Sequence, residues 1–419
     1  EVQREHGRAP QRRDDHAGAE AVPVGSAYVV RRRGRLSVTF TYDSAYLAFP
    51  DARAVDPQLP LSSGAHHTDG LPGAFADAAP DRWGRRLIDK ATRASAAAQG
   101  IRARACDDLD YLLGVSDLTR QGSLRFATSA GGPYVAQGAL VPPVVDLPAL
   151  LEAARSAARD DGSMAAVKAL LDAGTASLGG ARPKASVREG EDLAIAKFPH
   201  DGDDWDVMAW EHLALTLAEL AGIDVPQHHL VRIGERNVLV VRRFDRAARH
   251  GGRVPYVSAM TLVGARDGDL RDYLDVGEAI QEVGTVVAAD LRELWRRMAF
   301  SVGIRNTDDH LRNHGFLGDG QGWRLAPVFD VNPDPHAAAE RATAICGAAS
   351  VEDEVAGLLS AAPSFGLSPS EVHSVLAEVI GALSRWRTEA QRAGIDATQI
   401  ERFAPSLDDS GRRLAAALD

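Results

Sequence analysis

Cysteine and long apolar runs are both scarce in this 419-residue chain. Two cysteines, Cys106 and Cys346, cannot form a disulfide framework, and they favour a reducing, cytoplasmic location. No stretch approaches the roughly 20 uninterrupted apolar residues of a membrane helix. Residues 1–20 are charged and lack the apolar core of a signal peptide. The sequence therefore argues against membrane and secreted roles.

The chain also lacks an excess of positive charge. Lys and Arg number 47 against 58 Asp and Glu, which gives a formal net charge of −11. This balance disfavours tight binding of nucleic acid by the isolated chain. Apolar residues make up 45% and charged residues 25% of the sequence, as in ordinary globular proteins with a large core.

Lysine is rare, and arginine supplies most of the positive charge. A lysine ammonium is a compact point charge, whereas a guanidinium is a planar fork, so a chain rich in arginine can retain lysine where the compact group is needed. Codon bias alone can also scatter so few lysines. The lysines are Lys90, Lys168, Lys184 and Lys197.

Changes in composition and periodicity predict four parts along the chain. The first is polar and aperiodic, which is typical of disorder. The second opens with two short β-rich runs split by Gly34, as in a hairpin. A linker-like Gly131-Gly-Pro133 precedes the third, and the fourth is chiefly helical. The predicted boundaries are 1–20, 21–130, 131–245 and 246–419.

The densest polar cluster is Asn306-Thr-Asp-Asp-His-Leu-Arg-Asn313. It follows an apolar helical stripe in 291–302 and precedes a predicted hairpin that pairs Gly315-Phe-Leu317 with Trp323-Arg-Leu-Ala326. Asp330 follows the hairpin. An Asp, an Asn five residues later, a strand pair and a second Asp form the arrangement that phosphoryl transfer needs. Asp308 can orient and deprotonate the attacking hydroxyl, while Asn313 and Asp330 offer hard oxygen ligands for magnesium on nucleotide phosphates. The spacing selects Asp308 rather than Asp309.

Two other interpretations of this cluster stay open at the level of the sequence. Asp and Asn side chains also cap ordinary polar turns. His310 and His314 stand at helical spacing, as zinc ligands can. Against zinc, the neighbourhood offers no obvious third ligand.

Two upstream segments are candidates for phosphate contacts. Lys197 lies in an apolar, strand-like run, where burial is costly unless the ammonium is paired. Its partner can be a phosphate or the carboxylate of Glu211, although an edge-strand lysine facing solvent fits the same pattern. The loop 177–184 offers glycines, backbone N–H groups and a lysine, but matches neither the P-loop nor the Rossmann pattern. The order of these parts is that of a protein kinase.

These motifs resemble the HipA-type serine/threonine kinase toxins of bacterial toxin–antitoxin modules. The resemblance implies an α+β, two-lobed protein-kinase-like fold. It also implies a small additional N-terminal α/β subdomain in 21–130, an N-lobe in 131–245 and a mostly helical C-lobe in 246–419. The motifs that carry it are Phe75-Ala-Asp-Ala-Ala-Pro-Asp-Arg-Trp-Gly84, Ser177-Leu-Gly-Gly-Ala-Arg-Pro-Lys184, Ile195-Ala-Lys-Phe-Pro199, Val241-Arg-Arg-Phe-Asp-Arg246, Asn306-Thr-Asp-Asp-His-Leu-Arg-Asn313 and Leu325-Ala-Pro-Val-Phe-Asp330.

The resemblance implies ATP and Mg²⁺ as cofactors and transfer of phosphate to a protein serine or threonine. Asp308, Asn313 and Asp330 become the catalytic residues, and Asn313 and Asp330 hold the metal. Ser177 matches a loop serine that such kinases phosphorylate on themselves. The segment Arg242-Arg-Phe244 matches the family's hinge, which lies beside the adenine. That hinge often carries an acidic residue at the position of Arg242. The residues expected at the nucleotide are Gly179, Gly180, Ala181, Arg182, Pro183, Lys184, Lys197, Arg242, Phe244, His310, Asn313, Phe329 and Asp330.

The resemblance also implies a small helix-turn-helix antitoxin as partner, with DNA contacted mainly through it. Family substrates include aminoacyl-tRNA synthetases, and no membrane is involved. Two alternatives remain: a small-molecule phosphotransferase, and a catalytically weak co-repressor scaffold that binds the antitoxin. Aminoglycoside-type phosphotransferases commonly place His before the catalytic Asp, whereas this chain has Thr307, which favours the protein kinase.

Overall fold

The computed structural model describes residues 2–4, 21–32, 35–137, 141–159, 163–174, 182–246, 252–336 and 340–418. The chain divides into two compact units. Unit 1 comprises Glu1–Gly202 and Val240–Val257, and unit 2 comprises Asp203–Leu239 and Ser258–Asp419. Both units contain helices and strands, which confirms the predicted α+β class. The predicted four-part boundaries stay a prediction.

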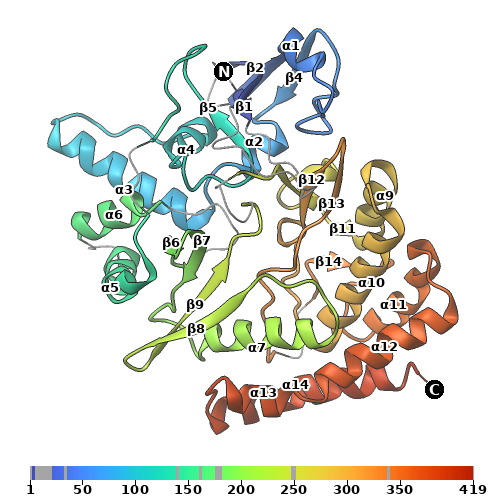
Figure 1. Cartoon of the computed structure of the whole chain (residues 1–419). Helices are drawn as coiled ribbons and strands as arrows, with labels where there is room; N and C mark the ends of the chain where they lie inside the picture. Colours follow the sequence, from blue (N-terminus) through green and yellow to red (C-terminus); the bar gives the residue numbers. More distant parts are fainter. Residues whose placement is uncertain are drawn as a thin grey trace. The chain divides into compact units, whose positions relative to one another are not determined.

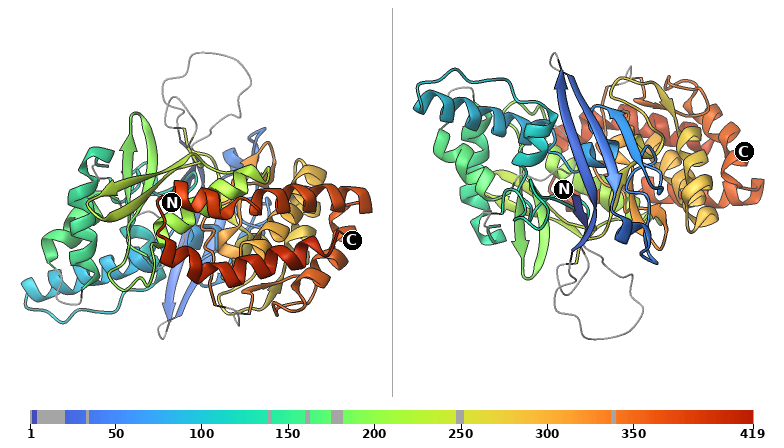
Figure 2. Two further views of the ribbon diagram at one scale, coloured as in Figure 1. Left: turned by 90° about the horizontal axis from the view of Figure 1, so that it is seen from below. Right: turned by 90° about the horizontal axis from the view of Figure 1, so that it is seen from above.

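Unit 1 opens with a five-stranded sheet of order β4-β3-β2-β1-β5. The long antiparallel pair β2 and β3, blue in Figure 2, is the predicted hairpin. Apolar residues alternate along β3, so Val38 and Phe40 face the core while their neighbours are more exposed. Three residues of the predicted disordered leader form β1 instead, because they pair with β2 and β5. The strands are β1 (Val2–Arg4), β2 (Val22–Arg32), β3 (Arg35–Tyr42), β4 (Ala65–Asp69) and β5 (Leu124–Phe126).

The longest helix of unit 1, α3, follows directly from its sequence. Asp81 caps it by accepting a hydrogen bond from the Gly84 amide at 2.8 Å. Trp83 and Leu87 are buried on one face of the helix, and α3 packs against α6, which packs against α5 (Figure 1). The helices of this unit are α1 (Ser44–Leu47), α2 (Gly73–Asp77), α3 (Arg82–Ala98), α4 (Asp108–Gly114), α5 (Leu147–Ala158) and α6 (Met164–Asp172), with a 3₁₀ turn η1 (Val144–Asp146).

A second sheet has the order β6-β7-β9-β8. Its strands β6 and β7 pair antiparallel around Gly190, whose φ of +60° suits the turn. The register places Lys184 opposite Lys197. The strands are β6 (Lys184–Glu189), β7 (Asp192–Lys197), β8 (His228–Ile233) and β9 (Arg236–Arg242).

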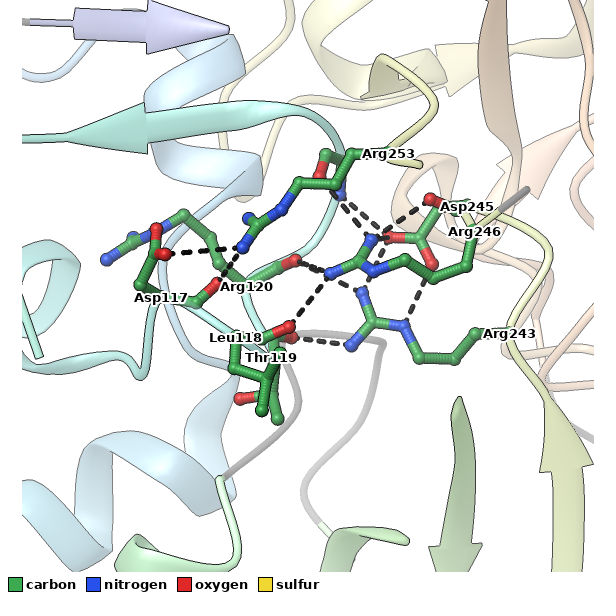
Figure 3. Close-up of polar contacts among 9 residues, drawn as sticks. Asp117, Leu118, Thr119, Arg120, Arg243, Asp245, Arg246 and Arg253 are labelled. Carbon is green, nitrogen blue, oxygen red and sulfur yellow. Dashed lines mark hydrogen bonds and ion pairs between the residues drawn. The ribbon is translucent and has the colours of Figure 1, made fainter. Parts of the chain in front are cut away.

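An arginine-rich ionic cluster joins two parts of unit 1, residues 117–122 on one side and residues 243–246 with Arg253 on the other (Figure 3). Asp245 is fully buried, and its Oδ2 accepts from Arg243 Nη2 at 2.6 Å and from Arg246 Nη1 at 2.9 Å. The same oxygen accepts from the Gly122 amide at 2.8 Å. Beside it, Arg120 donates to three main-chain carbonyls, and burial lowers the pKa of Arg120 to about 9. Buried charges paired in this way fix the two segments together.

Unit 2 is mostly helical around α10, which packs on α12 and α14 (Figure 1). The predicted apolar stripe is buried on α10, and its residues are Leu291, Leu294, Trp295, Met298 and Val302. Gly303 ends this helix, and a Cβ placed there would lie 2.2 Å from Leu383 Cδ1 and 2.8 Å from Leu414 Cδ1. The helices are α7 (Val207–Leu220), α8 (Ala259–Leu262), α9 (Tyr273–Val283), α10 (Val287–Gly303), α11 (Glu354–Ala361), α12 (Pro369–Leu383), α13 (Trp386–Arg392) and α14 (Ala397–Ala415), with 3₁₀ turns η2 (Leu311–Asn313) and η3 (Ala362–Phe365).

The remaining strands of the described residues are short. β12 (Gly315–Asp319) and β13 (Gly322–Leu325) form the predicted hairpin, and the sheet order is β10-β12-β13 with β10 (Tyr256–Ser258). β11 (Arg271–Asp272) and β14 (Thr343–Ala344) pair in parallel. Within the residues described above, none of the helices is both long and apolar enough to cross a bilayer.

Candidate active site

The predicted catalytic loop lies in unit 2, between α10 and β12. Arg305 takes the chain out of the helix with a left-handed φ of +61°, a conformation that is strained for a residue other than glycine. The two consecutive acids then differ sharply in environment. Asp308 is exposed, whereas Asp309 is only 7% exposed. The structure therefore leaves Asp308, the acid selected by spacing, accessible to a substrate.

Asn313 is folded back toward the start of this loop. Its Nδ2 donates to the Asp308 carbonyl at 3.3 Å, and its amide donates to the His310 carbonyl at 2.8 Å. Its Oδ1 is buried and has no hydrogen-bond partner. A buried acceptor without a partner costs free energy, and a cation contacting it removes that cost. The Asn313 amide oxygen therefore suits a metal ligand.

Asp330 is tied to the loop through Asn332. Asn332 Nδ2 donates to Asp330 Oδ1 at 3.4 Å, and the Asn332 amide donates to Asn306 Oδ1 at 3.3 Å. Asp330 has a φ of +58°, and the neighbouring Phe329 is buried. Left-handed backbone at a non-glycine residue persists only where the surroundings hold it, and it clusters at functional sites. The carboxylate and the Asn313 amide are both hard oxygen donors, as magnesium requires.

The two histidines of the zinc alternative lie in different surroundings. His310 is half-buried, and its Nδ1 has no hydrogen-bond partner. His314 is buried, with Nε2 3.1 Å from Asp309 Oδ1 and its ring edge-on to Tyr273. Across the described ranges, no three His, Cys, Asp or Glu residues are placed to hold a metal. The proposed magnesium site uses one carboxylate, one amide and phosphate oxygens, so it does not need three such residues.

Sequence reasoning missed the buried residues that support the loop. The Asp309 carboxylate accepts from the Tyr273 hydroxyl. Burial by itself raises the pKa of Asp309, but His314 and Tyr273 outweigh it and hold that pKa well below its usual range. Burial also raises the pKa of the Tyr273 phenol. Asp309 is named in the predicted motif, but no local pattern reveals Tyr273, which lies 36 positions upstream in the sequence.

In unit 1, Lys184 has a partner that the sequence analysis did not anticipate. Its Nζ lies 2.6 Å from Asp81 Oδ2, and the two side chains are only 2% and 6% exposed. The Lys184 carbonyl also accepts from Trp83 Nε1 at 3.1 Å. Strand β6, which follows the predicted glycine loop, is thus bound through Lys184 to the first turn of α3. Asp81 and Trp83 belong to the motif at residues 75–84, which is one of those that carry the family resemblance.

The other predicted nucleotide contacts of unit 1 lie on or next to β6, β7 and β9. Lys197 is buried, as is Pro183, whose carbonyl accepts from the Phe198 amide at 2.9 Å. Arg182 is half-buried. Arg242 forms an ion pair with Asp192 at 2.8 Å. Phe244 packs against Ile195, and Ser177, Gly179, Gly180 and Ala181 lie outside the described residues.

In unit 2, Glu211 is buried on α7. The pairing of Glu211 with Lys197 stays a prediction, as do the roles of all the predicted nucleotide and metal ligands.

The α+β architecture and the order of loop, hairpin and second Asp define a protein-kinase-like fold. Two family sequence models match the chain. The HipA N-terminal domain matches residues 21–112, and the HipA-like C-terminal domain matches residues 176–386, half of the chain. The chain belongs to the HipA family, which confirms the resemblance.

Comparisons with individual proteins agree. A solved structure of the Shewanella oneidensis MR-1 toxin–antitoxin system, HipA and HipB with operator DNA, is similar over 96% of this chain and 96% of that chain, with 15% identity and a TM-score of 0.58. At that identity the likeness shows the fold. A curated Haemophilus influenzae protein, provisionally named a kinase, is 28% identical over 142 residues. The match covers 30% of this chain and 41% of that protein, so the chain spans about two fifths of its relative's length.

Proposed function

We propose that this protein is an ATP- and Mg²⁺-dependent serine/threonine protein kinase that acts as the toxin of a bacterial toxin–antitoxin module. One observation carries the proposal. The loop that exposes Asp308 also buries an unpartnered Asn313 Oδ1, and it is linked through Asn332 to the left-handed Asp330. Family membership supports the same conclusion.

In this proposal each residue has one task. The exposed Asp308 carboxylate accepts the proton of the attacking serine or threonine hydroxyl and orients its oxygen. Asn313 Oδ1 and the Asp330 carboxylate hold the metal, which when bound neutralises charge on the nucleotide phosphates. Lys197 contacts a phosphate, and Phe244 lies beside the adenine. The loop that ends in Arg182, Pro183 and Lys184 covers the phosphates with its main chain, while the Lys184 ammonium stays paired with Asp81.

The partner is proposed by analogy to the Shewanella complex, in which HipA is found with HipB and operator DNA. We infer that a helix-turn-helix antitoxin binds this chain and supplies most of the DNA contact. The net charge of −11 agrees, because a chain of this sign gains little from phosphate backbone contacts of its own. The proposed substrate is a protein of the translation machinery, such as an aminoacyl-tRNA synthetase.

Transfer of labelled phosphate from ATP tests the proposal. The purified protein is incubated with Mg²⁺ and ATP, with and without EDTA, together with candidate protein acceptors. We expect label on serine or threonine that depends on the metal. Label on a small alcohol alone identifies a small-molecule phosphotransferase. Binding of the antitoxin without any label identifies a co-repressor scaffold, and either result contradicts the proposal.

The proposal also predicts that the protein phosphorylates itself at Ser177. A phosphate adds a charge of about −2 beside a site built for the anions of ATP, so the modified protein should transfer phosphate more slowly. Mass spectrometry after incubation with Mg²⁺ and ATP should find the phosphate on Ser177, and Ser177→Ala should stay active for longer. Wild-type protein that is unmodified after long exposure to ATP contradicts this prediction.

A further inference from the structure

The main chain on both sides of Asp308 is hydrogen-bonded to a segment that follows Asp330 in the sequence. The Thr343 Oγ1 hydroxyl donates to the Asp309 carbonyl at 2.7 Å. The Ala342 amide donates to the Thr307 carbonyl at 2.9 Å. The Thr307 carbonyl belongs to the peptide group that joins Thr307 to Asp308, and the Asp309 carbonyl lies one peptide group beyond Asp308. The two bonds therefore hold the main chain on both sides of Asp308.

The Asp309 side chain is held from a second direction. Its carboxylate accepts from the Tyr273 hydroxyl and lies 3.1 Å from His314 Nε2. Tyr273 begins α9 directly after β11, and β11 pairs in parallel with β14, which contains Thr343. Tyr273 and Thr343 are 0% and 1% exposed. Two neighbouring elements thus contact one residue of the loop, through its side chain and through its carbonyl.

The supporting segment is itself anchored in the core of unit 2. Arg341 Nη1 donates to Glu354 Oε2 at 3.0 Å, and Arg341 Nη2 donates to Ser301 Oγ at 2.6 Å. Ser301 Oγ in turn donates to the Asn306 carbonyl at 3.0 Å. Arg341 and Glu354 are each 1% exposed as side chains. A segment fixed in this way has little freedom to follow a shifted loop, so it can set the loop's position.

We propose that Thr343 and Tyr273 are positioning residues that hold Asp308 in its catalytic geometry through Asp309. This inference rests on the proposed kinase function and adds two residues to its machinery. Neither residue contacts the reacting atoms. Their effect comes through geometry, because a shift of about 1 Å in a catalytic group can lower a rate by about a hundredfold.

The test compares Thr343→Val with Thr343→Ser. Valine has the shape of threonine but no hydroxyl, whereas serine keeps the donor to the Asp309 carbonyl. We expect Thr343→Val to lower kcat for phosphate transfer by about 10- to 100-fold and to change KM for ATP by less than about twofold. Thr343→Ser should keep kcat within about threefold of wild type.

A matched control comes from Thr216 on α7, whose hydroxyl donates to the His212 carbonyl at 2.9 Å. Thr216→Val removes the same type of hydrogen bond from the same unit, away from the loop, and should leave kcat unchanged. Tyr273→Phe provides a second variant, and we expect kcat to fall about tenfold with KM for ATP unchanged. If both bonds act on one residue, the double variant Tyr273→Phe/Thr343→Val should lose less than the product of the single losses.

Hydrogen exchange of residues 306–313, followed by mass spectrometry, reports on the loop itself. Thr343→Val should speed exchange there relative to Thr343→Ser, while exchange elsewhere in unit 2 matches the Thr216→Val control. Equal kcat values for Thr343→Val and Thr343→Ser in an active kinase overturn the positioning role and leave the kinase proposal standing. A wild-type protein that transfers no phosphate to any acceptor overturns both.

Discussion

Replacing Asp245 by alanine is expected to destabilise the protein by about 3–5 kcal/mol, enough to unfold much of unit 1 under ordinary conditions. The carboxylate is completely buried and accepts four hydrogen bonds: from Arg243 Nε and Nη2, Arg246 Nη1 and the Gly122 amide (Figure 3). Its removal leaves two guanidinium groups without their counter-charge in a site with little water. That uncompensated charge is the source of the loss.

The same contacts give the Asp245 effect a pH dependence. Burial by itself raises the pKa of this carboxyl, but Arg243 and Arg246 outweigh it and hold the pKa far below the usual value for aspartate. In the unfolded chain the group titrates near pH 4, at about its ordinary value. The carboxylate therefore stabilises the fold fully above about pH 4, and this contribution is lost as the pH falls toward the depressed pKa of the folded state.

Urea denaturation of the wild type and Asp245→Ala, followed by circular dichroism, measures the difference. Asp172→Ala is the matched control, because it breaks an exposed pair with Lys168 on α6 and should cost about 0.5 kcal/mol or less. Asp245→Ala retains Arg243 and Arg246 as buried charges without the Asp245 carboxylate, so its urea midpoint should fall well below that of the control. A fall no larger than the control's would contradict the assigned role of the ionic cluster.

Much of the fold could be predicted from local sequence signals. The alternation of apolar residues in Leu36–Tyr42 predicts β3, and the stripe that contains Leu294 and Trp295 predicts α10. The spacing of Asp308 and Asn313 selects one of two adjacent acids, and the structure exposes that acid while it buries Asp309. These features are local, because each depends on residues within one element or one loop.

The features that could not be predicted depend on contacts between distant residues. Lys184 and Asp81 are 103 positions apart, and nothing near either residue indicates that they pair. Thr343 and Asp309 are 34 positions apart, and a lone threonine carries no signal of its own. Val2–Arg4 lies in a charged, aperiodic segment, and it forms a strand only because β2 and β5 offer partners on both sides.

Replacing Asp308 by asparagine is expected to lower phosphate transfer by a factor of about 10³ or more. Asparagine keeps the size of the side chain but cannot accept the hydroxyl proton. Because the Asp308 side chain is exposed and asparagine keeps its size, the substitution should leave the free energy of unfolding within about 0.5 kcal/mol of wild type. The loss should therefore appear in kcat, with Mg²⁺–ATP binding retained.

The control for Asp308 is Asp267→Asn, which makes the same charge change at an exposed carboxylate that pairs with Arg312 of the same loop at 3.0 Å. It removes a surface ion pair and no proposed catalytic group, so its rate should stay within about twofold of wild type. If both variants lost the same factor in phosphate-transfer rate, the rate would depend on negative charge near the loop. Asp308 would then not be the catalytic base.

Single-turnover transfer of labelled phosphate from Mg²⁺–ATP, measured side by side for the wild type and Asp308→Asn, decides between these accounts most directly. We expect rapid labelling of serine or threonine by the wild type, none when EDTA removes the metal, and a rate at least about a thousandfold lower for folded Asp308→Asn. Equal rates in the two proteins, or labelling that continues without a divalent ion, would contradict a catalytic site built on Asp308, Asn313 and Asp330.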